Sequence, residues 1–241
     1  MKWIKDTTGR FPKRPHYLPE ELDASCEAIV REFLIDRHGR VDYPIRTDDL
    51  TVLLERDAKD LDLYADFSGE EGEIEGVTEF RNGEKPRVRI AARLTNSLSL
   101  ENRLRTTLTH EYGHVHFHNS LFQASATTGN LFEAASPSPL EGTAHRCNRD
   151  AMLSMSGRDW MEWQAGYVCG AMLIPIQPLI KRIREFRLDM ALEDCSIAEG
   201  EPEGIALIQI VSEDFQTSRD AARVRLLQKG YLTLPGQQSL L

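Results

Sequence analysis

A short stretch from His110 to His114 constrains this chain more than any other part of its sequence. It reads His-Glu-Tyr-Gly-His. On an α-helix, residues four apart lie about 40° apart around the axis and roughly 6 Å along it, so two imidazoles at this spacing can bind one metal ion. Glu111 follows the first histidine, and its side chain projects beside the metal. The pattern is typical of zinc peptidases, in which two histidines bind the metal and the glutamate acts on water.

The sequence around the motif favours a helix with a buried face. Leu104, Leu108 and Val115 flank the motif at near-helical spacing. The alternative is a histidine-rich amphipathic helix whose imidazoles only pack or face solvent. Because the chain has 7 histidines in 241 residues, chance alone rarely places two of them around a glutamate in this way. We therefore predict a metal-binding helix.

Composition limits the classes of protein to be considered. The chain is 41% hydrophobic, which suffices for one sizeable core and a small appended domain. Its formal net charge of −9 does not favour non-specific binding to nucleic acid or to an anionic membrane. The first residues lack the apolar core of a signal peptide, and the sequence has no run of about 18 apolar residues, so we expect no contact with a membrane and a cytoplasmic location. The 4 cysteines form no CxxC pair, which argues against a cysteine-based zinc site.

Three segments are predicted along the chain. Residues 1–42 form a basic, extended N-terminal segment and a helix from Pro19 to about residue 37. Residues 43–192 form the metallopeptidase domain, and residues 119–158 within it are a long connection, either a surface loop or a flap beside the site. Residues 193–241 form a linker and two short helices that resemble a helix-turn-helix, the second of them capped by Thr217.

A small antiparallel sheet is predicted just before the histidine helix. Residues 61–67 and 76–80 alternate between apolar and polar, as strands with one buried face do. Asn82-Gly83 is a strong hairpin turn, and residues 87–91 form the returning strand. The expected fold class is therefore α+β, with the sheet packed on helices.

A catalytic zinc normally takes a third protein ligand. His118 continues the spacing, but it lies about 12 Å along the helix from His110, too far to share one ion. The metzincin arrangement needs a glycine and a histidine where this chain has Phe117 and Ser120. A carboxylate from another helix remains, and Glu162 lies in a helix predicted over residues 160–175, on a face of small residues. The residues leave rivals open, namely Glu133, Glu141 and Asp159.

Two stretches together resemble the ImmA/IrrE family of zinc metallo-endopeptidases. The first runs from Arg105 to His118, and the second has Glu162, an alanine three residues later and a Leu-Ile-Pro ending at Pro175. The likeness extends loosely over residues 43–232. It departs from the family pattern at three positions, where the family often has other residues: Thr106, Gly166 and Val168.

The resemblance implies a site and a role. It implies a zincin-like core in which His110, His114 and Glu162 bind Zn²⁺ and Glu111 is the catalytic glutamate. Family members resemble soluble bacterial, phage or mobile-element regulators, and several cleave helix-turn-helix repressors and so switch on genes after stress. The implied partner is therefore a protein substrate, such as a repressor of that kind.

Some features of the expected site stay open at this point. Candidates to stabilise the oxyanion of the intermediate are Tyr112, His145 and Tyr167. His116 and His118 are expected to brace the helix end or to face solvent. The sequence does not determine the oligomeric state.

Parts of the sequence also fit two functions other than a peptidase. One is a DNA-binding regulator that uses a basic cluster in the tail, although four basic side chains are few for a phosphate footprint. That cluster consists of Arg219, Arg223, Arg225 and Lys229. The other is a metal-binding protein without peptidase activity, for instance a toxin–antitoxin component. Direct binding of nucleic acid is not expected.

Overall fold

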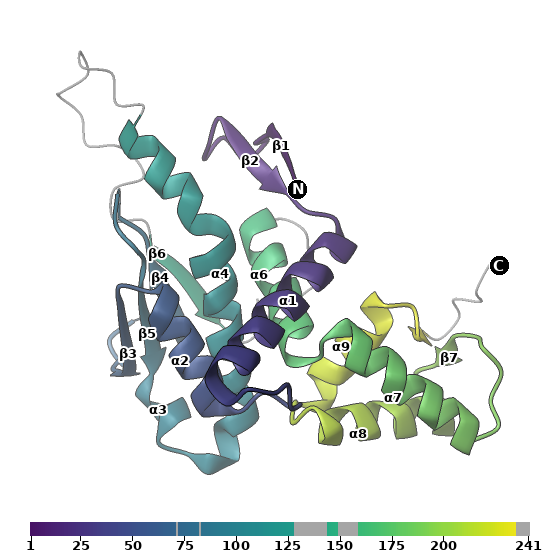
Figure 1. Cartoon of the computed structure of the whole chain (residues 1–241). Coiled ribbons are helices and arrows are strands. Elements are labelled where there is room, and N and C mark those ends of the chain that lie inside the picture. The colour runs from purple at the N-terminus through teal and green to yellow at the C-terminus, as the bar shows by residue number, and fades with distance from the viewer. Residues whose placement is uncertain (71, 82, 128–143, 149–158, 235–241) are drawn as a thin grey trace. The chain divides into compact units, whose positions relative to one another are not determined.

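The computed structural model describes residues 1–70, 72–81, 83–127, 144–148 and 159–234 (Figure 1). Packing divides the chain into two compact units. Unit 1 contains Met1–Leu22 and Thr47–Cys169, and unit 2 contains Asp23–Arg46 and Gly170–Leu241. The segment boundaries predicted at residues 42 and 192 stay predictions. The mixture of helices and small sheets confirms the α+β class.

Unit 1 carries most of the strands and the long histidine helix. Its elements in chain order are β1 (Lys2–Lys5), β2 (Lys13–His16), the start of α1 (Pro19–His38), α2 (Thr47–Asp57), β3 (Asp60–Ala65), β4 (Ile74–Glu79), β5 (Arg87–Ala91), α3 (Ala92–Thr95), the 3-10 turn η1 (Leu98–Leu100), α4 (Glu101–Thr127), β6 (Ala144–Asn148) and most of α6 (Trp160–Leu173). The N-terminal segment predicted to be extended is an antiparallel hairpin of β1 and β2.

The sheet of unit 1 is mixed, which corrects the antiparallel sheet predicted from the sequence. Its strand order is β3-β5-β4-β6. The hairpin around Gly83 pairs β4 antiparallel with β5, and β6 is also antiparallel to β4, but β3 and β5 are parallel. The chain leaves β3, passes to β4, and returns with β5 into the place between them. The predicted alternation is seen in β3, but β4 is buried on both faces, and alternation does not specify which strands become neighbours.

Two other predictions need correction. The histidine helix does not end near residue 118 but continues to Thr127, and residues 144–148 form the edge strand β6. The predicted connection over 119–158 is therefore partly regular structure, and its remaining residues lie outside the described part of the chain. β6 forms because β4, already paired on one side, offers its other edge to an antiparallel partner.

Unit 2 is mostly helical. Its elements are the rest of α1 and α6, then α7 (Ile176–Asp189), β7 (Ile197–Ala198), α8 (Pro202–Asp214), α9 (Arg219–Gln228) and β8 (Leu232–Thr233), with β7 and β8 paired in parallel. The two short tail helices are confirmed as α8 and α9. The cap of α9 is Ser218, whose hydroxyl accepts from the amide of Ala221 at 3.1 Å, and not the predicted Thr217. Thr217 is buried, and its amide bonds the carbonyl of Ser212.

A buried ion network holds unit 2 together. Arg225 and Lys229 of α9 reach the two carboxylate oxygens of Asp23 in α1 at 2.6 and 2.8 Å. Arg225 Nε also donates to the carbonyl of Ile174 at 3.2 Å. Burial raises the pKa of Asp23, but the charge of Arg225 and the hydrogen bonds from Lys229 and Arg225 outweigh it, so that the pKa is lowered. The ionised carboxylate of Asp23 therefore stabilises the folded state at every pH at which it is deprotonated.

We expect Asp23→Asn to lower the free energy of unfolding by about 3–5 kcal/mol, because it leaves buried Arg225 without a counter-charge. The wild-type advantage should be complete above the unfolded aspartate pKa of about 3.9 and should shrink as pH falls towards the lowered folded value. Urea unfolding at several pH values measures both effects. Asp42→Asn is the matched control, since Asp42 pairs with Arg40 in an exposed position, and it should change little. Equal effects of the two substitutions would contradict the prediction.

Candidate metal centre

The middle of α4 is buried on all sides. Every residue from 107 to 115 is buried, and His110, Glu111 and His114 are each 1% exposed or less. The sequence had predicted a helix with one buried face, but the sheet covers one side of this stretch and α6 another. Polar side chains in such a place need partners close by, because burial without hydrogen bonds is costly. The motif therefore lies inside unit 1, and its polar side chains contact β4 and α6.

A close crossing of α4 and α6 brings the third carboxylate to the histidines. A Cβ on Gly113 would lie 2.9 Å from the Cα of Ala165, closer than real Cβ atoms approach. One turn before Gly113, Thr109 Oγ1 donates to Cys169 Sγ at 3.3 Å. Ala165 and Cys169 belong to the face of small residues that also carries Glu162, and their facing partners are Gly113 and Thr109. The crossing places Glu162 beside His110 and His114.

We expect Gly113→Ala to weaken zinc binding by moving α6 away from α4. Alanine favours a helix over glycine by about 1 kcal/mol, but overpacking costs about 1–3 kcal/mol, so the free energy of unfolding should fall. Gly170→Ala is the matched control on α6, because its new Cβ would make an ordinary contact of 3.5 Å with Arg225. Chelator competition measures the affinity of both variants. If Gly113→Ala binds zinc as tightly as Gly170→Ala does, the close crossing does not position Glu162.

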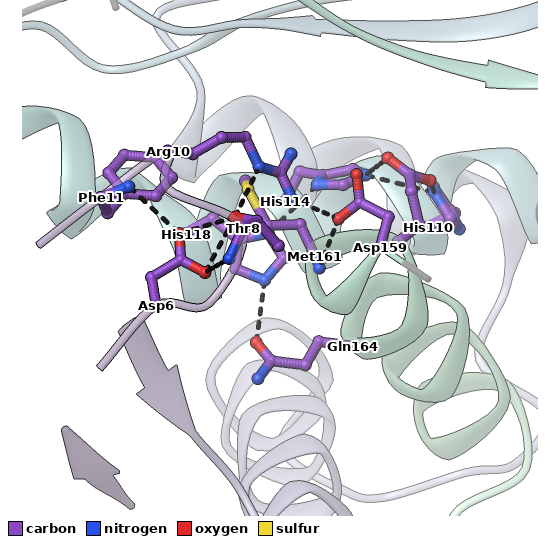
Figure 2. Close-up of polar contacts among 11 residues, drawn as sticks. Asp6, Thr8, Arg10, Phe11, His110, His114, His118, Asp159, Met161 and Gln164 are labelled. Atoms are coloured by element: carbon purple, nitrogen blue, oxygen red, sulfur yellow. Dashed lines mark hydrogen bonds and ion pairs between the residues drawn. The ribbon is translucent and has the colours of Figure 1, made fainter. Parts of the chain in front are cut away.

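The three residues predicted as ligands converge on one point. Figure 2 shows two of them, His110 and His114. His110 Nε2 lies 3.1 Å from Glu162 Oε2 and 3.2 Å from His114 Nε2, and His114 Nε2 lies 3.3 Å from Glu162 Oε1. Zinc–ligand distances of about 2.0–2.1 Å in a tetrahedral arrangement place ligand atoms about 3.3 Å apart. All three separations match that value. The donor set, two imidazoles and one carboxylate, is one that suits zinc.

The electrostatic field at the site favours a cation. Burial disfavours the imidazolium form of His110, but the hydrogen bond to Glu162 and the carboxylates of Glu162 and Glu111 favour it more strongly. The pKa of His110 is therefore raised. Buried groups that attract a proton in this way also attract a metal cation.

Glu111 is held against β4 and not in the ligand group. Thr78 Oγ1 donates to Glu111 Oε2 at 2.5 Å. A Cβ on Gly76 would lie 2.5 Å from Glu111 Oε1, so only glycine lets this strand come so close to the carboxylate. Gly76 and Thr78 lie two apart on the same face of β4. Neither residue was predicted to belong to the site. The alternating pattern predicted the strand, but it does not show which side chains pack against that strand.

Of the rival ligands, the structure describes Asp159, and it is not at the site. Asp159 is occupied elsewhere: its Oδ1 accepts from Arg10 Nη2 at 2.6 Å and from the amide of Met161 at 2.9 Å. Glu133 and Glu141 lie outside the described residues. Within the described ranges, His110, His114 and Glu162 are the group of metal-binding side chains that meets.

The three residues predicted as oxyanion donors lie in different surroundings. Tyr112 Oη donates to Asp57 Oδ2 at 2.8 Å, and burial together with Asp57 raises the pKa of the tyrosine, so its hydroxyl is committed to that carboxylate. Tyr167 is buried with its ring 5.7 Å from that of Trp163. His145 lies in β6, and its side chain is outside the described part of the structure.

The two remaining histidines of α4 differ in their exposure to solvent. His116 is exposed and stacks on Tyr112, in keeping with the prediction. His118 is buried and contacts His114, with 3.1 Å between their Nδ1 atoms. The four-residue spacing from His114 to His118 was a signal for this contact, although not for a third metal ligand.

No protein-family model and no curated protein matches the chain. The interpretation of the site therefore depends on its own geometry. Within the described residues, no helix is both long enough and apolar enough to cross a membrane.

Proposed function

We propose that the protein is a zinc-dependent endopeptidase with a zincin-like core. The observation that carries the proposal is the convergence of His110, His114 and Glu162 at zinc-like separations, with Glu111 next to His110 on the same buried helix turn. The resemblance of the two motif stretches to the ImmA/IrrE family supports the same assignment.

When bound, zinc would act as a Lewis acid on a peptide carbonyl and make a water molecule more acidic. His110 and His114 would hold the ion through Nε2, and Glu162 through its carboxylate. Glu111 would accept the proton of the attacking water and deliver it to the leaving amine. Thr78 fixes one oxygen of Glu111 by a hydrogen bond, and the bare backbone of Gly76 leaves room for the other. The base is thereby set in one orientation before the substrate arrives.

For the substrate we propose a protein, in particular a helix-turn-helix repressor cleaved in a cytoplasmic regulatory switch. This part of the proposal rests on the family resemblance. The acidic chain suits a protein substrate better than a nucleic acid.

The tail offers little support to the DNA-binding alternative. Arg223 pairs with Glu199, and both Arg225 and Lys229 pair with Asp23. Three of the four clustered basic side chains thus have internal counter-charges, which weakens a phosphate-binding surface. A metal-binding protein without hydrolytic activity would have the same ligands, and only a test of activity separates it from a peptidase.

Two measurements test the proposal together. Elemental analysis after mild purification should find about one zinc per chain, and His110→Ala should lose it. The zinc-loaded protein should then cleave a proteome-derived peptide library, with fragments identified by mass spectrometry. Co-expression with a repressor encoded beside it tests the substrate. Zinc content that is unchanged in His110→Ala would contradict the site, and a library left intact would contradict the activity.

A further inference from the structure

A line of hydrogen bonds leads from the metal centre to the N-terminal hairpin. His114 directs Nε2 at the ligand group and Nδ1 at His118 Nδ1, 3.1 Å away. His118 Nε2 lies 3.0 Å from Gln164 Oε1, and Gln164 Nε2 donates to the backbone carbonyl of Pro15 at 3.1 Å. Figure 2 shows His118 next to His114, with Gln164 on its other side. His114, His118 and Gln164 are each 1% exposed or less, so water does not compete for these contacts.

The donor and acceptor properties of the groups determine which atom donates in each of these hydrogen bonds. A carbonyl can only accept, so the amide nitrogen of Gln164 must face Pro15 and its oxygen must face His118. That oxygen also only accepts, and therefore His118 carries its proton on Nε2. The Nδ1 of a neutral His118 is then an acceptor, so that His114 donates from Nδ1. His114 is left with an Nε2 lone pair that faces the ligand group, as a metal requires.

We propose that His118 and Gln164 are positioning residues that hold His114 in the tautomer and ring orientation needed to bind the metal. This inference rests on the metal centre of the proposed function, but not on hydrolysis. It assigns to the N-terminal hairpin a part in building that centre, since the line ends on a carbonyl of β2.

The hairpin end of the line is anchored independently. Arg10 pairs with Asp159 at the start of α6, and Phe11 packs edge-on against Trp160 and Phe122. Asp6 accepts from Thr8 and from the amide of Phe11, which closes the turn between β1 and β2. The hairpin that carries the Pro15 carbonyl is thus held in place by contacts that do not involve Gln164.

His110 provides a contrast within the same site. Its Nδ1 is buried and has no hydrogen-bond partner among the described residues. The two histidine ligands are therefore oriented differently, His110 by Glu162 and His114 also by the line from the hairpin. Loss of His118 should consequently affect one ligand and leave the other in place.

Four full-length variants test the proposal by zinc affinity, measured by chelator competition. His118→Phe keeps a ring beside Trp160 but removes the acceptor, and it should weaken zinc binding about 10- to 100-fold. His118→Asn places an amide oxygen near the position of Nδ1 and should restore most of that loss. Gln164→Leu should weaken binding less than His118→Phe. His116→Phe, the same change two residues earlier, is the control and should bind zinc as the wild type does.

A second readout reports the protons themselves. Long-range ¹H–¹⁵N correlation spectra of zinc-loaded, ¹⁵N-histidine-labelled protein should show His118 protonated on Nε2 and a slowly exchanging Nδ1 proton on His114. In His118→Phe that His114 proton should exchange faster. His118 protonated on Nδ1 alone would overturn the direction of the line.

The outcomes separate this inference from the proposed function. A wild type that binds no zinc contradicts the metal centre itself. A wild type that binds zinc while His118→Phe binds it equally well overturns the positioning role alone. Equal losses in His118→Phe and His118→Asn also overturn it, because the acceptor would then not be what matters. Should circular dichroism show that His118→Phe is unfolded, Gln164→Leu and His118→Asn carry the comparison.

Discussion

Glu111→Gln is expected to abolish hydrolysis while the protein keeps its fold and its zinc. The substitution removes the base and leaves the three ligands untouched, and general-base catalysis contributes about 10²–10⁴-fold to the rate. Glutamine can still accept from Thr78 through its amide oxygen, so the packing against β4 should survive. Cleavage rates on a peptide from the library, together with zinc content, measure both parts of the prediction.

Two variants control this result. Glu32→Gln makes the same chemical change at an exposed position of α1 and should leave the rate unchanged. Thr78→Val keeps Glu111 but removes the hydrogen bond that orients it, so it should lower the rate by less than Glu111→Gln does. A Glu111→Gln protein that still cleaves at a comparable rate would contradict the mechanism and favour a metal-binding protein in which this glutamate is structural.

The second large effect is expected for Glu162→Ala, which should weaken zinc binding by more than about 100-fold. That figure is the upper end for residues that only support a ligand, and the loss of a charged ligand should exceed it. Alanine cannot coordinate, and it also removes the carboxylate that draws positive charge to His110. Chelator competition gives the affinity, and circular dichroism should show little change in helix content.

Asp159→Ala is the comparison that decides the ligand. Asp159 lies three residues before Glu162 but pairs with Arg10, so its loss should loosen the hairpin and leave most of the zinc affinity intact. If only Asp159→Ala loses zinc, the third ligand is Asp159 and the match of the second helix to the family has no chemical meaning.

The local part of the site was predictable because it depends on spacing along one helix. The intervals between His110, Glu111 and His114 fix their relative directions once the segment is helical, and the apolar flanks predicted the helix. The hairpin turn at Gly83 was predictable for a similar reason, since its φ of +76° is a conformation that glycine adopts readily. In each case the cause lies within a few neighbouring residues.

The family resemblance had singled out Glu162, but what brings it to the histidines and keeps Asp159 away is tertiary structure, and Glu133 and Glu141 lie outside the described residues. The residues alone left four carboxylates open, and what separates Glu162 from Asp159 is the Gly113–Ala165 crossing and the pairing of Asp159 with Arg10. The parallel pairing of β3 with β5 escaped prediction too, because an alternating pattern does not specify which strands become neighbours.

The sequence by itself determined a helix that presents two histidines and a glutamate in fixed order. Only the tertiary structure decided what surrounds them: Thr78 and Gly76 at Glu111, and His118, Gln164 and the Pro15 carbonyl behind His114. The physical reason is that spacing along a helix is set by backbone geometry, whereas a hydrogen bond between distant segments exists only after packing has brought a donor and an acceptor within about 3 Å of each other.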